Sequence, residues 1–409
     1  MIIECDILVV GAGPAGSSAA RAAALGGAKT ILIDKKKEIG YPVQCAEGIG
    51  KYLFPYLPFK IPKDQLIWCI DGMRFWVEGI SVDHTSSGFH GYSIDRRNFD
   101  KWVANLAVKS GAKILTETEL VDLELNEEYK VKNVELKTSK KELKIQPKVV
   151  VGADGCESTV LNLLGLYKPK RGDVGEVYSF EMENLKIEKP HIQNLHFGDF
   201  APTGWGYVFP KSKTRANIGI GEILPKGDLE PKFHEFIEEY EPMRKMVGKD
   251  AEIVSEKITK VRHGNIVDKW IYNNVLLVGD AANQNIKPYY EGILPAIVCG
   301  NVAGRLADDM LKGREVSDYQ YKELVRKALF PYFDFSTNLI DLMIDVANIN
   351  SRKKYLLISG AMIVTSLIEE INHIKPEQLL SLKDKSYDEL MKFIMRTANI
   401  RTVSELFKT

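Results

Sequence analysis

The sequence predicts an α/β fold in three parts: a Rossmann-type dinucleotide-binding domain, an inserted antiparallel-sheet domain and a helical C-terminal region. Three observations predict it. A continuous apolar run leads directly into a glycine-rich turn at residues 11–16, apolar and polar residues alternate over residues 170–262, and long apolar stretches follow residue 313. With 409 residues, 45% of them hydrophobic, the chain can bury a core in each part.

Charge and composition exclude several classes of partner. Lysine plus arginine equals aspartate plus glutamate, 55 against 55, so no global field favours nucleic acid. The five cysteines are few, odd in number and scattered, which argues against a secreted disulfide framework, and none of them forms a CxxC pair. The seven histidines form no cluster typical of a metal site, so a bound metal is not expected. The balanced charge likewise gives no reason to expect a nucleic-acid partner.

The location of the protein is predicted from its apolar segments. No basic leader precedes the first apolar run, and no stretch reaches the roughly 18 to 20 apolar residues of a spanning helix. We therefore expect a cytoplasmic protein. The longest apolar candidate, residues 355–368, is interpreted first as a core helix. The alternative is a surface that contacts lipid or another subunit, and contact with lipid would place the protein at the inner membrane face.

The first 34 residues predict strand, turn, helix and strand. Gly11, Gly13 and Gly16 have GxGxxG spacing, which permits a tight turn, close approach of backbone to a pyrophosphate, and close packing of the helix on the strand. The phosphates are expected on the helix N-terminus, and Asp34 ends the second strand, where a carboxylate accepts hydrogen bonds from a ribose. The predicted dinucleotide site therefore comprises Gly11, Gly13, Pro14, Ala15, Gly16, Asp34 and Lys35.

Three later blocks resemble those of FAD-dependent enzymes of the aromatic-hydroxylase type. They are RxxFD at Arg96, a GADG turn at residues 152–155 and a GD turn at Asp280. The resemblance implies that Arg96 contacts the phosphate side of an FAD and that Asp280 binds its ribityl or phosphate part. A carboxylate suits that role because it accepts hydrogen bonds from ribityl hydroxyls. A helix beginning near Gly292 would direct its N-terminal dipole at the charge of a reduced flavin.

A second GxGxxG is absent from the sequence, so a separate NAD(P)H domain is not supported. Reducing power must reach the flavin from an external electron donor. Reduced ferredoxin, a deazaflavin and NAD(P)H all remain open.

An aromatic strand is predicted in the alternating region. Trp205, Tyr207 and Phe209 alternate, so they project from one face of a strand that Pro210 ends. One explanation is a sheet face packed on a helix. In an FAD enzyme the same face can cover the isoalloxazine and line an apolar tunnel.

Two segments are similar to motifs of the geranylgeranyl reductase family, which includes archaeal digeranylgeranylglycerophospholipid reductases. PVQCAEGI around Cys45 resembles the PxxC segment, and GWGYVFPKSKTRANIGIG resembles YxWxFP followed by GxG. The likeness covers residues 4–310 in the same order. It implies hydrogenation of isolated C=C bonds of geranylgeranyl chains, with hydride from reduced FAD and a proton from Cys45 or Tyr207. It adds Cys45, Ala46, Gly48, Leu120, Gly292 and Ile293 to the cofactor site, and its lipid lining is Trp205, Tyr207, Phe209, Pro210, Gly219, Gly221, Tyr289 and Tyr290.

The sequence also departs from that family. Tryptophan and tyrosine are exchanged in the aromatic motif, and Tyr289, Tyr290 and Glu291 replace small residues of a glycine-rich turn. Glu291 beside a reduced flavin would oppose its negative charge unless it is protonated or turned away. Two alternatives therefore stay open: a flavin monooxygenase or halogenase, and a non-catalytic lipid-binding flavoprotein.

The domain boundaries are predicted from the positions of these blocks. Residues 1–65, 95–168 and 265–312 form a discontinuous FAD-binding domain. Residues 66–94 and 169–264 form the substrate domain, and residues 313–409 form the helical C-terminal domain.

Overall fold

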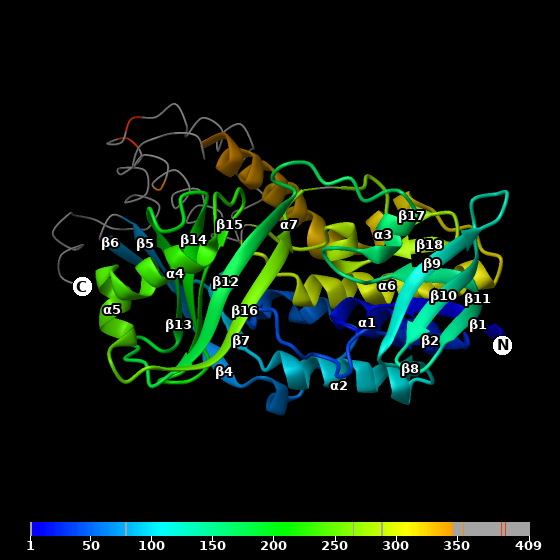
Figure 1. Cartoon of the computed structure of the whole chain (residues 1–409), viewed down its shortest axis with the longest axis horizontal. Helices are drawn as coiled ribbons and strands as arrows, with labels where there is room; N and C mark the ends of the chain where they lie inside the picture. The colour runs from blue at the N-terminus through cyan, green and yellow to red at the C-terminus, as the bar shows by residue number, and fades with distance from the viewer. Residues whose placement is uncertain are drawn as a thin grey trace.

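The computed structural model describes residues 2–77, 80–264, 266–287 and 289–346, together with residues 355, 386 and 389. Two sheets stand side by side along the long axis of the molecule (Figure 1). Strands from the beginning and the middle of the chain meet in both, so neither sheet is built from one continuous segment.

The first sheet has eight strands, and its main path runs β17-β18-β11-β1-β2-β8. The central pairs are parallel: Val9 of β1 lies opposite Leu32 of β2 on one side and Val151 of β11 on the other. Strands buried on both faces need continuous apolar runs, as the sequence near residues 7–10 predicts. The strands are β1 (Ile2–Val10), β2 (Thr30–Ile33), β8 (Lys113–Leu115), β9 (Thr118–Leu125), β10 (Val131–Thr138), β11 (Glu142–Gly152), β17 (Ile271–Tyr272) and β18 (Val275–Leu277).

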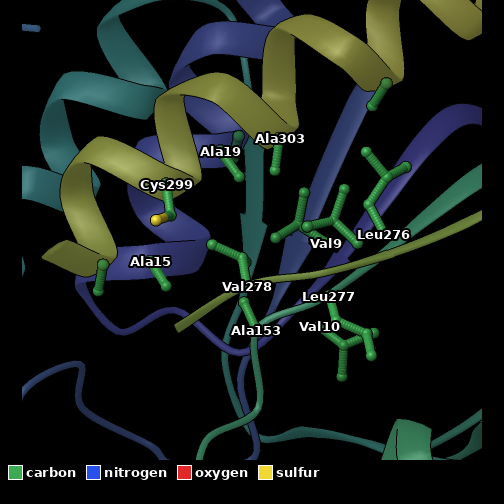
Figure 2. Close-up of a cluster of buried hydrophobic side chains, with 14 of the residues drawn as sticks. Val9, Val10, Ala15, Ala19, Ala153, Leu276, Leu277, Val278, Cys299 and Ala303 are labelled. Carbon is green, nitrogen blue, oxygen red and sulfur yellow. The ribbon is translucent and has the colours of Figure 1, made fainter. Parts of the chain in front are cut away.

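Helices α1 (Pro14–Leu25) and α6 (Ile293–Leu311) pack tightly together against this sheet. Ala15 and Ala19 of α1 lie beside Cys299 and Ala303 of α6 (Figure 2). A Cβ added to Gly300 would lie 2.3 Å from the Ala15 carbonyl oxygen, so the small residues set how closely the helices approach. This contact joins the glycine-rich turn to the helix that follows the GD turn. The other helices of this part are α2 (Arg96–Lys109) and α3 (Thr159–Leu163).

The second sheet has seven strands in the order β16-β12-β15-β14-β13-β5-β6. Its pairs are antiparallel, as predicted, except one: β5 runs parallel to β13. The reason is the connection: between β5 and β13 the chain leaves the second sheet to form β8–β11 of the first, so no hairpin forces the two strands to run antiparallel. The strands are β5 (Gly72–Val77), β6 (Ile80–His84), β12 (Val174–Glu183), β13 (Ile192–Phe197), β14 (Gly204–Pro210), β15 (Ala216–Glu222) and β16 (Glu252–Arg262).

Two helices that alternation does not predict, α4 (Leu229–Glu238) and α5 (Glu241–Val247), cover one face of the second sheet. Phe233 and Phe236 of α4 are fully buried in a core with Phe180 and Ile218. The opposite face of the sheet is therefore the one that turns toward the dinucleotide-binding part. A small third sheet links the two parts through β3 (Gly48–Gly50), β4 (Trp68–Ile70) and β7 (Gly91–Ser93).

The helical C-terminal region is described in part. Helix α7 (Asp318–Val346) anchors through the buried Tyr321, whose hydroxyl donates to the carbonyl oxygens of Cys299 (3.1 Å) and Leu277 (3.3 Å). The apolar stretch 355–368 lies outside the described residues apart from Tyr355. Within the described part of the chain, no helix is long and apolar enough to cross a bilayer.

Candidate functional site

A cavity of about 590 Å³ lies between the two sheets and is lined by residues of both. Of the predicted cofactor residues, all line this cavity except Gly16. Gly16 packs instead on the turn, where a Cβ would lie 1.8 Å from the Gly11 carbonyl oxygen. The lining set is Gly11, Gly13, Pro14, Ala15, Asp34, Lys35, Cys45, Ala46, Gly48, Arg96, Leu120, Asp280, Gly292 and Ile293.

The predicted lipid-lining residues divide in two. Trp205, Tyr207, Phe209, Gly221, Tyr289 and Tyr290 line the cavity, whereas Pro210 and Gly219 do not. Gly219 lies opposite Tyr207 in the β14–β15 pair, and a Cβ there would be 2.6 Å from the Tyr207 hydroxyl oxygen. The tyrosine ring therefore covers this glycine. Its function is to make room for Tyr207, and the prediction that Gly219 itself lines the cavity is wrong.

The glycine-rich turn has the geometry of a phosphate cradle. Gly11 has a φ of +100°, and a Cβ there would lie 2.4 Å from the Ala153 carbonyl oxygen, so only glycine fits. Beside Gly13, at the N-terminus of α1, a Cβ would meet nothing within 4 Å. This open space next to helical N–H groups accommodates a pyrophosphate. The residues present therefore fit a dinucleotide.

Asp34 is held in place at the same end of the cavity. Its Oδ2 accepts the N–H of Ala12 at 2.8 Å, and its Oδ1 accepts the N–H of Lys36 at 2.8 Å. These two bonds fix the carboxylate beside the glycine-rich turn. Each carboxylate oxygen keeps a second lone pair, which can accept a hydrogen bond from a hydroxyl group.

Arg96 and Asp100, both from the RxxFD block, pair with each other. The Arg96 Nε and Nη2 donate to the two Asp100 carboxylate oxygens at 2.7 and 2.8 Å. Burial alone would lower the pKa of Arg96, but the Asp100 carboxylate raises it above its ordinary value. The guanidinium therefore stays charged at the cavity wall.

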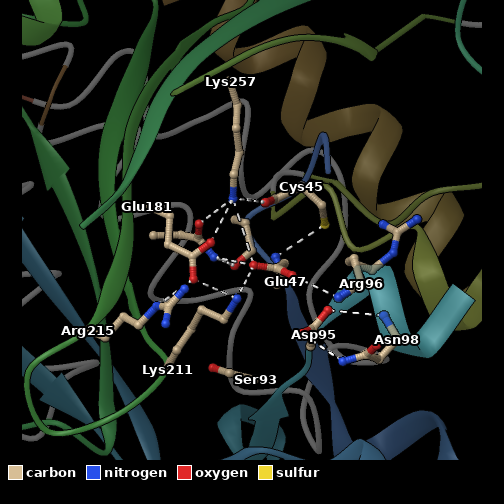
Figure 3. A network of polar contacts seen from close by, with 12 residues as sticks. Cys45, Glu47, Ser93, Asp95, Arg96, Asn98, Glu181, Lys211, Arg215 and Lys257 are labelled. Carbon is tan, nitrogen blue, oxygen red and sulfur yellow. Dashed lines mark hydrogen bonds and ion pairs between the residues drawn. The ribbon is translucent and has the colours of Figure 1, made fainter. Parts of the chain in front are cut away.

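The loop that carries Cys45 is tied to the second sheet by buried charges (Figure 3). The Glu47 carboxylate accepts Lys211 Nζ at 2.5 Å, Asn217 Nδ2 at 2.9 Å and the Arg96 N–H at 2.8 Å. Lys257 Nζ donates to Asn217 Oδ1 at 2.6 Å and reaches the Cys45 carbonyl oxygen at 3.4 Å. Strand β15, strand β16 and the start of α2 thus meet at one loop.

The buried charges of this network balance, and the partly exposed Arg215 adds a further cation beside Glu181. Lys211 and Lys257 face Glu47 and Glu181, with Lys211 Nζ 2.9 Å from Glu181 Oε1 and Lys257 Nζ 3.9 Å from Glu181 Oε2. A buried ion is tolerated when it is paired and hydrogen-bonded, so removal of any one member leaves an uncompensated charge.

Sequence reasoning missed this network. Glu181 and Lys257 stand at buried positions of β12 and β16. Each is a charged residue at a position where the alternation of the strand places side chains in the interior, and this pattern could have revealed them. The local sequence around Glu47 contains no such pattern, because Glu47 lies in a loop and its partners Lys211 and Asn217 are distant in the chain.

An aromatic wall closes the other side of the cavity. The Tyr290 ring stacks on Trp205, with centroids 5.5 Å apart and an interplanar angle of 8°, and its hydroxyl bonds to Nδ1 of His263. Tyr289 meets Phe89 edge to face at 6.2 Å. The two tyrosines that replace small residues of the family therefore shape the cavity wall.

Glu291 lines the cavity, and its carboxyl group is bonded to residues at the small sheet. Its Oε1 accepts the Gly50 N–H at 2.8 Å, and its Oε2 bonds to the Tyr52 hydroxyl at 2.7 Å. Burial raises the pKa of this carboxyl group. Both orientation and burial reduce the repulsion that a carboxylate in this turn would otherwise exert.

The comparisons with known proteins first establish the class. Residues 6–159 match the family described as FAD dependent oxidoreductase, and together with the relatives described next this match places the chain among the FAD-dependent oxidoreductases. Residues 173–261 match the geranylgeranyl reductase catalytic domain. These two regions contain the glycine-rich turn and the aromatic strand, respectively.

Two curated relatives then establish the family. A digeranylgeranylglycerophospholipid reductase of Methanocaldococcus jannaschii is 34% identical over 334 residues, covering 81% of this chain and 83% of that protein. Digeranylgeranylglycerophospholipid reductase 3 of Methanosphaera stadtmanae is 31% identical over 402 residues, covering 93% and 98%. The chain belongs to the geranylgeranyl reductase family.

Solved structures share the fold. A geranylgeranyl bacteriochlorophyll reductase-like protein from Thermoplasma acidophilum has a TM-score of 0.80 at 24% identity, with 97% of this chain and 100% of that one covered. The myxobacterial chondrochloren halogenase has a TM-score of 0.67 at 16% identity, with 99% of each chain covered. The predicted fold class is confirmed.

Proposed function

We propose that this protein is an FAD-dependent reductase that hydrogenates isolated C=C bonds in the geranylgeranyl chains of isoprenoid ether lipids of the archaeal type. One observation carries the proposal: the Cys45 loop and the aromatic strand line the same cavity as the glycine-rich turn. The curated relatives named above, which carry the name digeranylgeranylglycerophospholipid reductase, support this substrate class.

The cofactor would be held along the whole cavity. Gly11, Gly13 and Asp34 would bind the ADP part, and Asp280 and Gly292 the flavin part. Bound FAD, once reduced, supplies the hydride for the alkene. The remaining chemistry, which is the exclusion of water and the delivery of a proton, falls to side chains of this chain.

Cys45 is the proposed proton donor. Its thiol lines the cavity, and the Glu47 N–H donates to its Sγ at 3.2 Å. When the thiol gives up its proton, this N–H and the nearby Lys257 ammonium stabilise the thiolate. Tyr207 is the second candidate, but burial raises the pKa of its phenol, which makes it the weaker acid.

The aromatic wall would hold the lipid chain and exclude water. Trp205 and Tyr207 are each only 7% exposed and belong to the strand that faces the Cys45 loop. An unactivated alkene is hard to polarise, so its reduction needs a site without water and an acid close to the double bond. The aromatic residues would provide the first and Cys45 the second.

An external electron donor completes the proposal, and reduced ferredoxin, a deazaflavin and NAD(P)H remain the candidates. We also propose a cytoplasmic protein in peripheral contact with the inner membrane face, where its substrate lies. Apolar side chains on β16 support this contact: Ile253 and Ile258 are 57% and 64% exposed.

The test is anaerobic. The flavin of the purified holoenzyme is reduced chemically, geranylgeranyl lipids are added, and flavin reoxidation is followed together with the mass of the lipid. The proposal expects reoxidation and a gain of two mass units per double bond. A reduced flavin that ignores lipid and reoxidises only in air would favour a monooxygenase or halogenase; one that binds lipid without chemistry would favour a non-catalytic flavoprotein.

A further inference from the structure

A fully buried arginine lines the cavity with most of its guanidinium unpaired. Arg262, the last residue of β16, is 0% exposed. Its Nη2 donates to the Cys156 carbonyl oxygen, whereas its Nε and Nη1 meet no acceptor within the part of the chain that the structure describes. The guanidinium carbon lies 5.4 Å from the centre of the Tyr167 ring. The ring covers the guanidinium group but does not neutralise its positive charge.

The neighbouring charges do not balance this cation. Burial, together with the charge of Arg262, lowers the pKa of the adjacent Lys287 to about 7, although the Asp280 carboxylate acts in the opposite direction. Glu157 also lines the cavity, but it pairs with Lys260 at 2.7 Å. Arg262 and Lys287 therefore add positive charge to the same part of the cavity, where the Asp280 carboxylate opposes them. Burial of an unpaired charge costs several kcal/mol, so this arrangement calls for an anion.

We propose that Arg262 binds a phosphate group of a ligand in the cavity. A planar guanidinium with two free N–H-bearing nitrogens suits two phosphate oxygens, whereas a lysine offers only a point charge. Lys287 and Asn285 flank the site; Asn285 Nδ2 donates to the Arg262 carbonyl oxygen at 3.3 Å and to Asp280 Oδ1 at 3.0 Å. Through Asn285 the arginine is thus linked to the residue of the GD turn.

Two ligands of this protein carry such a phosphate. One is the head group of a phosphorylated lipid, a source that rests on the proposed function. The other is the diphosphate of FAD, a source that does not. Binding measurements without turnover separate them, and they also separate a failure of this site from a failure of the proposed reaction.

The test compares Arg262→Gln and Arg262→Lys with Arg314→Gln, a control that changes an arginine whose side chain is 65% exposed and pairs with Asp309. Each holoenzyme is titrated with digeranylgeranylglyceryl phosphate and with uncharged digeranylgeranylglycerol, and binding is followed by flavin absorption. FAD retention is measured by dialysis. Thermal midpoints check folding; if the phosphate is the lipid's, Arg262→Gln without lipid should be no less stable than the unaltered protein, because it loses an unpaired buried charge.

If the phosphate is the lipid's, Arg262→Gln lowers the preference for the phosphorylated lipid by about tenfold, Arg262→Lys lowers it less, and FAD retention is unchanged. If the phosphate is the cofactor's, Arg262→Gln weakens FAD binding by about tenfold and leaves the lipid preference intact. Arg262→Gln that alters neither quantity overturns the proposal. An unaltered protein that binds neither lipid counts against the proposed function, while the FAD measurement still tests Arg262.

Discussion

The backbone N–H of Glu47 donates a hydrogen bond to the sulfur of Cys45 at 3.2 Å, and Glu47 adopts a left-handed conformation with φ +68° to do so. A non-glycine residue keeps such a conformation only where its surroundings fix it. Here the buried bonds of the Glu47 carboxylate to Lys211 and Asn217 provide that restraint. The position of the Cys45 thiol thus depends on polar side chains at the end of β14 and in β15 of the second sheet.

Replacement of Cys45 tests the proton donor. Cys45→Ala should leave FAD bound and lower the rate of alkene reduction by about 100-fold, the usual lower range for loss of a general acid. The rate of lipid-dependent flavin reoxidation measures this effect, and FAD content serves as the control. Unchanged reoxidation would exclude Cys45 and direct attention to Tyr207.

Replacement of Lys257 tests whether the network positions the Cys45 loop. Lys257→Met removes a buried cation near Glu47 and Glu181, so we expect a loss of about 3 kcal/mol in unfolding free energy and altered alkylation of Cys45. Urea unfolding and mass analysis of the alkylated Cys45 peptide measure the two effects. The matched control is Lys260→Met on the same strand, where the side chain is 46% exposed.

In the Lys257→Met protein, the exposed Cys69 is an internal standard, because its alkylation should not change. Equal changes at Cys45 and Cys69 would indicate general loosening and would contradict a specific positioning role. Full stability together with normal Cys45 reactivity would also contradict it.

Gly219→Ala tests the packing beneath Tyr207. The added methyl group would lie 2.6 Å from both the Tyr207 hydroxyl and the Ser179 Cβ, so the ring must shift into the cavity. We expect weaker lipid binding, by about tenfold, with FAD retained. Gly221→Ala is the matched control: it also adds a methyl group at the cavity lining, but its closest contact would be Val177 at 3.2 Å and not the Tyr207 ring. Equal effects of the two alanines would argue against this specific contact.

Acid should destabilise the protein through its buried histidines. Burial lowers the pKa of His196 and of His263 to about 3, so both are neutral in the folded protein. In the unfolded chain they take up protons near pH 6.5, so their stabilising contribution is complete above that pH and is lost as the pH falls toward 3. Each histidine then costs about 1.4 kcal/mol of unfolding free energy per pH unit.

His196→Phe should reduce that pH dependence. The His196 ring stacks on Trp76 at 5.7 Å, and neither of its nitrogens has a hydrogen-bond partner among the described residues, so phenylalanine can replace it. Urea unfolding at pH 7.5 and 5.5 measures the difference, with His234→Phe, at a side chain 43% exposed, as control. An unaltered pH dependence in His196→Phe would refute this explanation.

Local sequence predicted much of the fold because its signals are local. The apolar run of β1, the glycines at 11 and 13 and the small residues of α1 each specify a nearby backbone geometry. The second sheet was less predictable. Alternation revealed its strands but not the parallel β13–β5 pair or helix α4, since pairing between distant segments depends on contacts that no short window contains.

By itself, the sequence determined the dinucleotide turn and the aromatic face of β14, because spacing and periodicity encode them directly, and it indicated the RxxFD and GD blocks through their resemblance to those of FAD-dependent enzymes. Only the tertiary structure decided which of these residues share a cavity, that Glu291 turns toward Gly50, and that Arg262 is buried with its guanidinium partly unpaired. The physical reason is that burial and charge pairing depend on all surrounding elements. For Glu47, partners more than 160 residues away in the chain decide the conformation of one loop residue.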